Sequence, residues 1–405
     1  MKVAFIVDMF PSLAETFILN QITGLIDLGH NVEIFAGARS TETEMHPEIQ
    51  HYGLLKRTHY HNEVPQNRVR RLIKGLLLIV ALFPRYPTVV LRSLNVLEYG
   101  GDAWSLSLFY KVALFLRHGT FDIIQCHFGH NGNLGALLKK MGIHGKIVTM
   151  FHGYDLRRAS DKDATMYAPV FQGGDCLLAI SDYSHRHLVA LGADPDKITY
   201  HPVGIDVESF PFRWASPLKV IPTPTTILSV ARLRQEKGLS YGIRAVNKLL
   251  RNNPHLAIEY RVIGGGPLKE ELERLVHELK LHKVVRLLGP GNRDEVIKAL
   301  AQAHLFLLPS DSEVLPVVLM EASATGLPAV ATSVGAVREI VMNGKSGFLV
   351  PRGDVEAMAE RLEHLIKYPA LWTDMGQVGR KVVEEKFYIR RLNKRLVEIY
   401  EGLLA

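Results

Sequence analysis

Two glutamates, Glu313 and Glu321, lie in a segment whose residue types suit the binding of an anionic ligand. An apolar run ends near Pro309, polar residues turn the chain, and a helix is predicted from Pro316 to about Thr325. The start of such a helix presents free N–H groups and a partial positive charge. Eight helical steps span about 12 Å, so one ligand could reach both carboxylates. On the spacing alone, an ordinary surface glutamate at position 321 is the better interpretation.

A pair of cations, Arg232 and Lys237, follows a predicted buried strand at the opening of the next helix. A rigid guanidinium and a compact ammonium can neutralise a diphosphate leaving group where no metal does so. The alternative is a solvated loop with ordinary surface cations. A DxD pair, Asp161 and Asp163, would suit a metal-held diphosphate, but it falls in a charge-rich stretch of helical pattern. Pairs of this kind also arise easily by chance, so this one is weak evidence for a metal site.

Two histidine-containing segments, CHFGHNG and FHGYD, each follow a predicted strand. They contribute His127, His152 and Asp155 as candidate site residues, and Gly153 allows a ligand to approach the backbone beside His152. A lone histidine is more often structural than functional. The chain lacks the paired His and Cys spacing that is typical of zinc sites.

Two further turns lie at the ends of predicted strands. The loop DMFPSLAETF brings Glu15 and Thr16 to the edge of the predicted ligand-binding face. The segment IGGGP, which begins at Ile263, predicts a tight strand-to-helix turn. Lys269 stands where a dinucleotide-binding fingerprint requires its third glycine, so the pattern disfavours a nicotinamide cofactor.

The elements that must position these residues are short apolar strands separated by helical patterns. Near-continuous apolar runs indicate strands covered on both faces, as in a parallel sheet flanked by helices. The chain has 405 residues, and a single hydrophobic core usually stops growing at about 250–300 residues. We therefore predict an α/β protein with two doubly wound, Rossmann-like domains facing across a cleft. The predicted strands are residues 3–7, 32–36, 122–126, 146–150, 176–180 and 198–201, then 226–230, 259–263, 284–288, 305–308 and 329–332.

The proline-rich segment PFRWASPLKVIPTP, residues 211–224, is the predicted linker. It separates an N-terminal domain, residues 1–210, from a C-terminal domain, residues 225–385. Residues 386–405 contain apolar side chains at the spacing of an amphipathic helix. These side chains are Leu392, Leu396, Ile399, Tyr400 and Leu403.

The net charge of +7 is concentrated in part of the chain, because the cations between residues 56 and 92 are opposed only by Glu63. That stretch includes RVRRLIKGLLLIVALFPRY, a basic start followed by an apolar body. It predicts either a helix lying on an anionic membrane surface or an ordinary helix packed on the core. The block lacks interleaved aromatics, which disfavours nucleic acid as a partner. Two cysteines, no secretory signal and no apolar run of bilayer length predict a cytoplasmic protein.

Together these segments resemble those of the retaining glycosyltransferases of family four, which have the GT-B fold. The resemblance extends over nearly the whole chain. It rests on HFG at His127, FHGYD at His152, VGID at Val203, VARLRQEKG around Arg232 and Lys237, IGGGP, and the helix with two glutamates. The start, FPSLAETFI, is most similar to the bacterial exopolysaccharide and colanic-acid-type branch of the family.

The resemblance implies a metal-independent hexosyltransferase without a cofactor, which moves a sugar from a nucleotide-sugar, such as a UDP-sugar, to another molecule. The implied acceptor is a saccharide or a lipid-linked saccharide used in polysaccharide biosynthesis, which would place the protein at the inner face of the plasma membrane. The C-terminal domain is expected to bind the donor and the N-terminal domain the acceptor. The final helix is expected to pack back on the N-terminal domain.

The resemblance also implies roles for individual residues. Arg232 and Lys237 would bind the diphosphate, Glu321 the ribose, and Glu313 would face the donor sugar. His152 would contact the transferred sugar near its anomeric centre. The implied donor-binding residues are Arg232, Lys237, Gly264, Gly266, Gly289, Arg293, Glu313, Val314, Leu315, Val317 and Glu321, and the implied acceptor or cleft-edge residues are Glu15, Thr16, His127 and Asp155.

The sequence departs from the family pattern in two places. Val314 stands where family members commonly have glycine after the first glutamate, and the first loop carries Leu13-Ala14-Glu15 in place of a glycine pair. Two alternatives therefore stay open. One is a sugar phosphorylase or nucleotide-sugar epimerase with the same fold, and the other is a catalytically silent nucleotide-sugar-binding protein.

Overall fold

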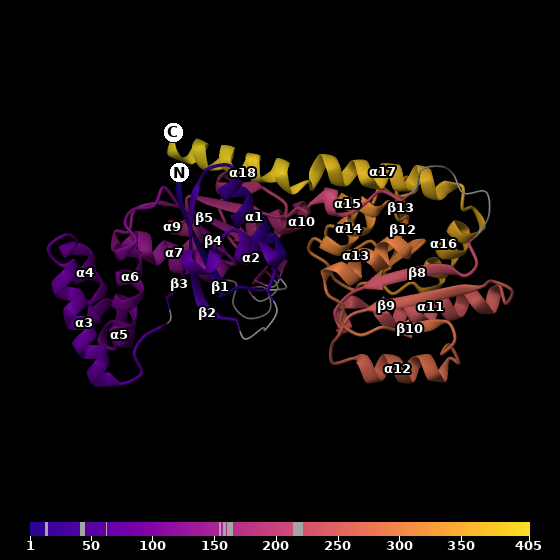
Figure 1. Cartoon of the computed structure of the whole chain (residues 1–405), viewed down its shortest axis with the longest axis horizontal. Helices are drawn as coiled ribbons and strands as arrows, with labels where there is room; N and C mark the ends of the chain where they lie inside the picture. The colour runs from indigo at the N-terminus through magenta and orange to yellow at the C-terminus, as the bar shows by residue number, and fades with distance from the viewer. Residues whose placement is uncertain are drawn as a thin grey trace. The chain divides into compact units, whose positions relative to one another are not determined.

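The computed structural model describes residues 1–12, 15–40, 45–61, 63–153, 155–156, 159, 165–213 and 222–405. The chain divides into two compact units, each built on its own parallel sheet (Figure 1). The first unit comprises Met1–His201 and Asn393–Ala405, and the second comprises Pro202–Leu392. The prediction of an α/β protein with two Rossmann-like domains is confirmed. The division after His201 precedes the predicted boundary at residue 210, and residues 214–221 of the predicted linker lie outside the described part.

The first sheet has seven parallel strands in the order β3-β2-β1-β4-β5-β6-β7. Strand β4 is buried throughout and β1 is buried from Val3 to Val7, because these apolar runs are covered on both faces. The strands are β1 (Lys2–Phe10), β2 (Asn31–Arg39), β3 (Thr58–Tyr60), β4 (Ile123–His127), β5 (Lys146–Phe151), β6 (Cys176–Ala179) and β7 (Ile198–Tyr200).

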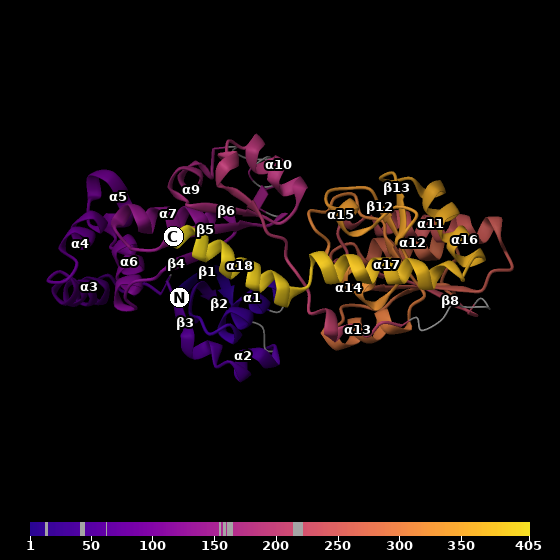
Figure 2. The same ribbon diagram turned by 90° about the horizontal axis from the view of Figure 1, so that it is seen from above.

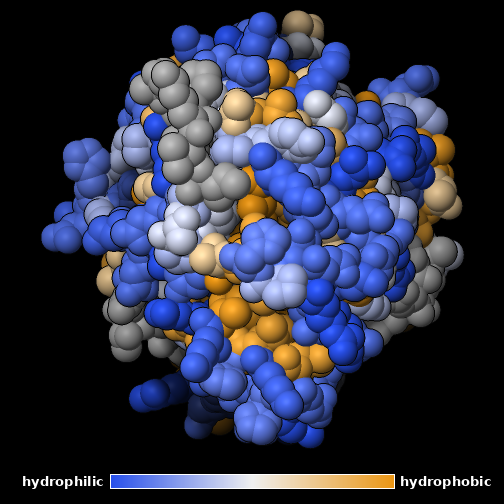
Figure 3. All heavy atoms as spheres, turned by 90° about the vertical axis from the view of Figure 1, so that its right-hand side faces the viewer, coloured by the Kyte–Doolittle hydropathy of each residue, from blue (hydrophilic) through white to orange (hydrophobic). Residues whose placement is uncertain are grey.

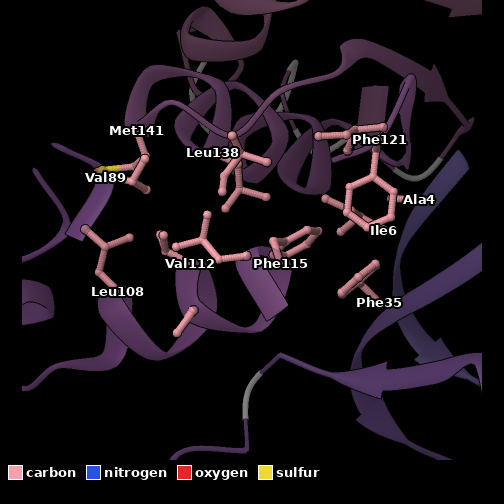
Figure 4. Packing of buried hydrophobic residues seen from close by; sticks show 14 of the residues in the cluster. Ala4, Ile6, Phe35, Val89, Leu108, Val112, Phe115, Phe121, Leu138 and Met141 are labelled. Atoms are coloured by element: carbon pink, nitrogen blue, oxygen red, sulfur yellow. The ribbon is translucent and has the colours of Figure 1, made fainter. Parts of the chain in front are cut away.

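Helices pack against this sheet and form its core. Figure 4 shows Ala4 and Ile6 of β1 and Phe35 of β2 lying among side chains of the covering helices, including Phe115 and Leu138. The helices of the first unit are α1 (Thr16–Asp27), α2 (Pro47–His51), α3 (Arg68–Leu82), α4 (Pro87–Ser93), α5 (Val96–Trp104), α6 (Ser107–Arg117), α7 (Gly129–Met141), α9 (Ala168–Gly173) and α10 (Asp182–Ala190), with short 3₁₀ turns η1 (Leu54–Arg57) and η2 (Pro195–Lys197).

The second sheet has six parallel strands in the order β10-β9-β8-β11-β12-β13. The strands are β8 (Thr225–Val230), β9 (Ile258–Ile263), β10 (Val285–Leu287), β11 (Leu305–Leu308), β12 (Ala329–Thr332) and β13 (Gly347–Val350). The helices are α11 (Leu239–Asn252), α12 (Lys269–Glu278), α13 (Arg293–Gln302), α14 (Val317–Thr325), α15 (Val337–Ile340), α16 (Val355–Lys367) and α17 (Leu371–Lys386), with 3₁₀ turns η3 (Val207–Ser209) and η4 (Gln235–Lys237).

Every predicted strand is present within one residue of its predicted position or extends beyond it. Two strands at sheet edges, β3 and β13, were not predicted. Each has only three or four residues, and β3, with sequence THY, is partly exposed throughout. Strand β3 lacks the apolar run that identifies a buried strand, whereas β13, with sequence GFLV, has a short one that the sequence analysis did not assign.

The last helix, α18 (Ile389–Leu404), belongs to both units. Its predicted amphipathic pattern is confirmed, because Leu392, Leu396 and Tyr400 are buried. From Asn393 onward the helix packs in the first unit, where the Tyr400 hydroxyl donates a hydrogen bond to Gln125 Oε1 at 2.8 Å.

The two cysteines, Cys126 and Cys176, are both free and buried. The face of the molecule seen in Figure 3 carries mostly hydrophilic side chains, with hydrophobic ones in patches between them. Among the described residues, no helix has both the length and the hydrophobicity needed to cross a bilayer.

Candidate functional site

The strongest candidate site in the second unit lies where β8 and β11 end. These strands are neighbours and run parallel, so the loops that follow them emerge at the same edge of the sheet. The first loop carries Lys237 and the second carries Glu313. Their side chains form an ion pair, with 2.7 Å between Lys237 Nζ and Glu313 Oε1.

Backbone hydrogen bonds hold these two loops together. The N–H groups of Asp311 and Ser312 both donate to the carbonyl oxygen of Glu236, at 2.9 and 3.3 Å. Because Glu236 directly precedes Lys237, these bonds fix the origin of the lysine side chain relative to the second loop. The pair therefore rests on a defined backbone arrangement as well as on charge.

Glu313 is almost entirely buried, with 6% of its surface exposed. Its Oε1 accepts hydrogen bonds from Lys237 Nζ and from Ser310 Oγ, both at 2.7 Å. A buried carboxylate requires such partners, because removing it from water is costly. Lys237 is more accessible, at 20% side-chain exposure, so its ammonium can also reach a ligand.

Gly335, in the loop after β12, lies against the backbone of Glu313. A Cβ atom at this position would be 1.5 Å from the Glu313 carbonyl oxygen, and the backbone has a positive φ of +52°. Only glycine fits both constraints. The sequence analysis assigned no role to Gly335. A glycine directly after a strand was the available signal, but its partner lies on another loop.

Helix α14 follows the loop that carries Glu313 and ends at Thr325, with Gly326 as its C-cap, close to the predicted limits. It starts at Val317 rather than at Pro316, which is the N-cap residue. Val314 and Leu315 are buried beside the helix start. The first turn has no acidic side chain, so its unpaired N–H groups and partial positive charge are not neutralised locally.

Glu321 lies farther along α14 and is partly buried. Burial raises the pKa of its carboxyl group to about 7, and the positive charge of Arg293 acts in the opposite direction. Arg293 is the first residue of α13, and its guanidinium also donates to Ser209 Oγ at 3.2 Å. The carboxylate is therefore poised to change its charge near neutral pH.

The turn that contains Gly264 and Gly266 packs on the loop that carries Arg232. Leu233 donates its N–H to the carbonyl of Gly265 at 2.9 Å, and Ala231 donates to Ile263 at 3.0 Å. These bonds hold the backbone on both sides of Arg232. The Arg232 side chain is exposed. Gly289 is the last of the predicted donor-site glycines and begins the exposed loop that leads to α13.

The first unit brings His127 and His152 together. His127 ends β4 and His152 follows β5, the neighbouring parallel strand. A hydrogen bond of 3.1 Å joins His127 Nδ1 to His152 Nε2. Burial lowers the pKa of His152 to about 3, and it lowers the pKa of His127 well below its ordinary value. Both rings are therefore neutral at pH 7, with one ring nitrogen donating and the other accepting.

Asp155 holds the backbone around these histidines. Its buried carboxylate accepts hydrogen bonds from the N–H groups of Gly129 and His152, at 3.1 and 3.2 Å. Burial raises the pKa of Asp155 to about 7, although these hydrogen bonds act against the rise. The side chain is only 1% exposed, so its place is behind the site rather than at an accessible edge.

The first turn of α1 also reaches this region. The ring of Phe17 lies 4.6 Å from that of His152. The carbonyl of Glu15 accepts the N–H of Ile18 at 3.0 Å and so begins the helix at Thr16. Leu13 and Ala14, at which the sequence departs from the family pattern, lie outside the described residues.

One polar group at this sheet edge was missed by the sequence analysis. Asp8, near the end of β1, pairs with His130 and accepts a hydrogen bond from Asn131 Nδ2 at 2.8 Å. Burial alone would raise the pKa of Asp8, but the contacts with His130 and Asn131 outweigh it and lower the pKa. An aspartate that interrupts the apolar run of a strand was the available signal.

Within the described residues, one group of three side chains could hold a metal ion: Glu33, His59 and His118. Glu33 lies near the start of β2 and His118 precedes β4, so both lie toward the amino ends of the strands. His127 and His152 lie at the carboxyl ends. This group is separate from the candidate site. Asp161 and Asp163 lie outside the described residues.

Comparison with known proteins shows what this chain is similar to. Residues 14–209 match the family model described as Glycosyltransferase Family 4, and residues 213–382 match the one described as Glycosyl transferases group 1. The chain is 34% identical to a protein of Salmonella typhimurium named as the colanic acid biosynthesis glycosyltransferase WcaL, over 100% of both chains. It is 33% identical to the amylovoran biosynthesis glycosyltransferase AmsK of Erwinia amylovora, again over 100% of both.

Solved structures share the fold. HepE of Anabaena, solved in complex with UDP-glucose, superposes with a TM-score of 0.72 at 15% identity, covering 99% of this chain and 100% of that one. Sucrose-phosphate synthase of Thermosynechococcus elongatus gives a TM-score of 0.71 at 17% identity, covering 100% and 99%. The predicted GT-B fold class is thus confirmed. The chain belongs to the glycosyltransferase family that the two sequence models describe, together with WcaL and AmsK.

Proposed function

We propose that this protein is a retaining, metal-independent hexosyltransferase that moves a sugar from a UDP-sugar to a lipid-linked saccharide in exopolysaccharide biosynthesis. Its relatives WcaL and AmsK, named for colanic acid and amylovoran biosynthesis, support the pathway class. HepE, which has the same fold and was solved with UDP-glucose, supports a UDP-sugar donor. We place the reaction in the cytoplasm, at the inner face of the plasma membrane.

The observation that carries the proposal is the ion pair between Lys237 and Glu313 beside the start of α14. A departing nucleoside diphosphate carries negative charge, which a fixed ammonium and a helix N-terminus both stabilise. The ion pair with Glu313 holds the Lys237 ammonium beside the start of α14. Arg232 adds a second cation on a loop that hydrogen bonds position.

The remaining donor contacts in this proposal are those that the resemblance to the family implies. Glu321 accepts the hydroxyl groups of the ribose, and Gly289 and Arg293 border the base. The N–H groups of Val314, Leu315 and Val317 face the sugar; Pro316 has none to donate. His152 contacts the transferred sugar, and Glu15 and Thr16 lie on the acceptor side of the first unit. His127, which is fully buried, and Asp155 support His152 from behind.

In the proposed reaction the acceptor hydroxyl attacks the anomeric carbon from the face that the diphosphate leaves. The new bond joins the acceptor oxygen to the anomeric carbon, and the bond from that carbon to the phosphate oxygen breaks. The hydroxyl proton passes to a phosphate oxygen of the leaving group. Protein groups contribute positioning and charge stabilisation, and none acts as a covalent nucleophile.

The test is a donor panel of UDP-glucose, UDP-galactose, GDP-mannose and ADP-glucose, read out as released nucleoside diphosphate with and without EDTA. We expect a UDP-sugar to be turned over, EDTA to have little effect, and Lys237→Ala to lower turnover at least about tenfold. The matched control is Lys248→Ala, which removes an ion pair of 2.9 Å with Glu356, between α11 and α16. It should leave turnover unchanged.

When no acceptor is added, water takes its place and the donor is hydrolysed. Proton NMR of the sugar first released from an α-linked donor then gives its configuration, and we expect the α anomer. Release of the β anomer, loss of activity in EDTA or full activity of Lys237→Ala would each overturn the proposal. Conversion of the donor without release of diphosphate would indicate an epimerase. Turnover that requires inorganic phosphate would indicate a phosphorylase, and binding of UDP without turnover a silent binding protein.

A further inference from the structure

Helix α3 of the first unit exposes an apolar stripe along its whole length. Seven large apolar side chains on or next to this helix are between 41% and 72% exposed. They recur three and four residues apart, which places them on one side of a helix. We call these residues, Val69, Leu72, Ile73, Leu76, Leu77, Val80 and Phe83, the α3 stripe.

The stripe is exposed because the opposite side of α3 is the one that packs. Gly75 lies so close to α6 that a Cβ atom would be 2.8 Å from Leu106 Cδ1. The Tyr110 hydroxyl of α6 donates to the carbonyl of Arg71 at 2.7 Å, and Arg71 Nε donates to the carbonyl of Pro65, also at 2.7 Å. Leu82 is buried in the core. The helix is therefore anchored, and the stripe cannot turn inward.

Helices α3, α4 and α5 lie at one end of the first unit, outside α6, in both views of the chain (Figures 1 and 2). Val89 of α4 packs with Leu108 and Val112 of α6 in the core shown in Figure 4. Exposed apolar side chains continue on this group of helices: Leu91 is 60% exposed, Leu97 100% and Trp104 80%. An apolar surface of this extent on a soluble fold indicates a binding surface.

The charges around the stripe indicate which kind of partner it binds. Residues 64–97 contain six cationic residues and no acidic one. With successive helical residues about 100° apart, Arg70 and Lys74 border one edge of the stripe and Arg68 the other. All three side chains are exposed. An apolar strip between cations fits an anionic bilayer, with the strip among acyl chains and the cations at the headgroups.

A second copy of this chain fits less well. A two-fold contact through the stripe would bring the same cations of both copies close together, with no acidic residue of this segment to compensate. We propose that the α3 stripe, with its flanking cations, docks the first unit on an anionic lipid bilayer. The helix then lies in the interface, and a lipid-linked acceptor shares that surface. The statement about the acceptor rests on the proposed function, whereas the docking of the α3 stripe on the bilayer does not.

The experiment is flotation with vesicles of phosphatidylcholine alone or with 30% phosphatidylglycerol. We expect the wild type to float with the anionic vesicles and much less with the neutral ones. Leu72→Ser combined with Leu76→Ser should lower the binding at least about tenfold. Arg70→Ser combined with Lys74→Ser should remove the preference for anionic lipid. The matched control, Leu55→Ser with Met342→Ser, changes two exposed apolar residues elsewhere and should bind as the wild type does.

A second readout uses Trp104, the exposed tryptophan of α5. Lipids brominated on the acyl chains should quench its fluorescence in the anionic vesicles, and Trp104→Phe should abolish that part of the quenching. Equal binding to both vesicles, or wild-type binding by the Leu72→Ser/Leu76→Ser variant, would overturn the inference. Self-association in sedimentation velocity that this variant loses, without vesicle binding by the wild type, would assign the stripe to a second copy instead.

The outcome is independent of the donor reaction. Release of nucleoside diphosphate without vesicles should be the same in the wild type and the Leu72→Ser/Leu76→Ser variant. A protein that floats but turns over no donor would refute the proposed function alone. A protein that turns over donor but does not float would refute the membrane surface alone.

Discussion

Glu313 and Lys237 illustrate how a buried charge and an accessible one can share a site. Removing one partner of a buried ion pair costs about 3–5 kcal/mol, because the other charge is left without compensation. Glu313 is the more buried of the two and keeps Ser310 as a second partner. In the proposed reaction, Lys237 transfers part of its interaction to an incoming phosphate. This asymmetry suits the proposed role, in which the lysine binds a diphosphate and releases it.

Glu321 should make donor binding depend on pH. With a pKa of about 7, its carboxyl group is mostly protonated at pH 6 and mostly ionised at pH 8. The ionised form accepts hydrogen bonds from both hydroxyl groups of a ribose more strongly than the protonated form, which has lost an acceptor site to its own proton. We expect the dissociation constant for UDP, measured by calorimetry, to fall about tenfold from pH 6 to pH 8.

Glu321→Gln is the control, since it cannot ionise. The variant should bind UDP more weakly than the wild type at pH 8 and should lose this part of the pH dependence. The folded-state pKa lies above the unfolded one, so this group lowers stability as the pH rises from about 4.5 to 7. Glu321→Gln should therefore unfold at a higher urea concentration than the wild type at pH 8. An identical pH dependence in both proteins would exclude the ribose role.

The loops after β8, β11 and β12 act together as one element of the site. Each is short, and each contacts another through the backbone: Glu236 with Asp311, and Gly335 with Glu313. The position of the Glu313 carboxylate therefore depends on a residue that has no side chain.

Gly335→Ala tests this dependence. The added methyl group would overlap the Glu313 carbonyl, so we expect the loop to shift, the protein to lose stability and diphosphate release to fall. Gly344→Ala is the matched control, since Gly344 also has positive φ, +74°, but has open space around its Cβ position. It should cost about 1–2 kcal/mol, from backbone strain alone. Equal losses of stability and activity in both variants, measured by urea unfolding and donor turnover, would contradict the role of Gly335.

The elements were largely predictable from periodicity. In strands such as β1 and β8 an apolar run is followed by turn residues, and both strands form at the predicted positions. The edge strand β3 was not predictable in this way, because its residues are partly exposed and its pairing with β2 defines it. The short apolar run of β13 was missed, although the edge strands β7 and β10 were predicted.

Over the whole molecule, α18 is the segment that contributes to both units. Its first residues pack in the second unit, where Ile389 donates its N–H to the carbonyl of Ile205 at 3.0 Å. Farther along, Asn393 Nδ2 donates to the carbonyl of Asn20 at 3.0 Å, in the first unit. The stability of the first unit therefore depends on residues nearly 400 positions from its first strand.

Tyr400→Ala should destabilise the first unit by about 3–5 kcal/mol, because it leaves a cavity where a fully buried ring packs. Tyr400→Phe keeps the ring and removes only the hydrogen bond to Gln125, which should cost about 1–3 kcal/mol. Hydrogen exchange should become faster in peptides of β1 and β4 and stay unchanged in those of β8 and β11.

Leu404→Ala is the control for Tyr400→Ala, because Leu404 lies in the same helix but is 43% exposed. It should leave exchange unchanged throughout. Equal acceleration in both units after Tyr400→Ala would show that the units unfold together rather than separately.

The order of strands and helices, the residue types of the site and the family could be read from the chain, because they depend on local periodicity and short motifs. The pairing of Lys237 with Glu313 joins residues 76 positions apart, and only the sheet order brings their loops to one edge. The contact between Gly335 and Glu313 arises in the same way. Periodicity shows that α3 has an apolar side but not whether anything covers it. That depended on which side of the helix packs on α6, and hence on the tertiary structure.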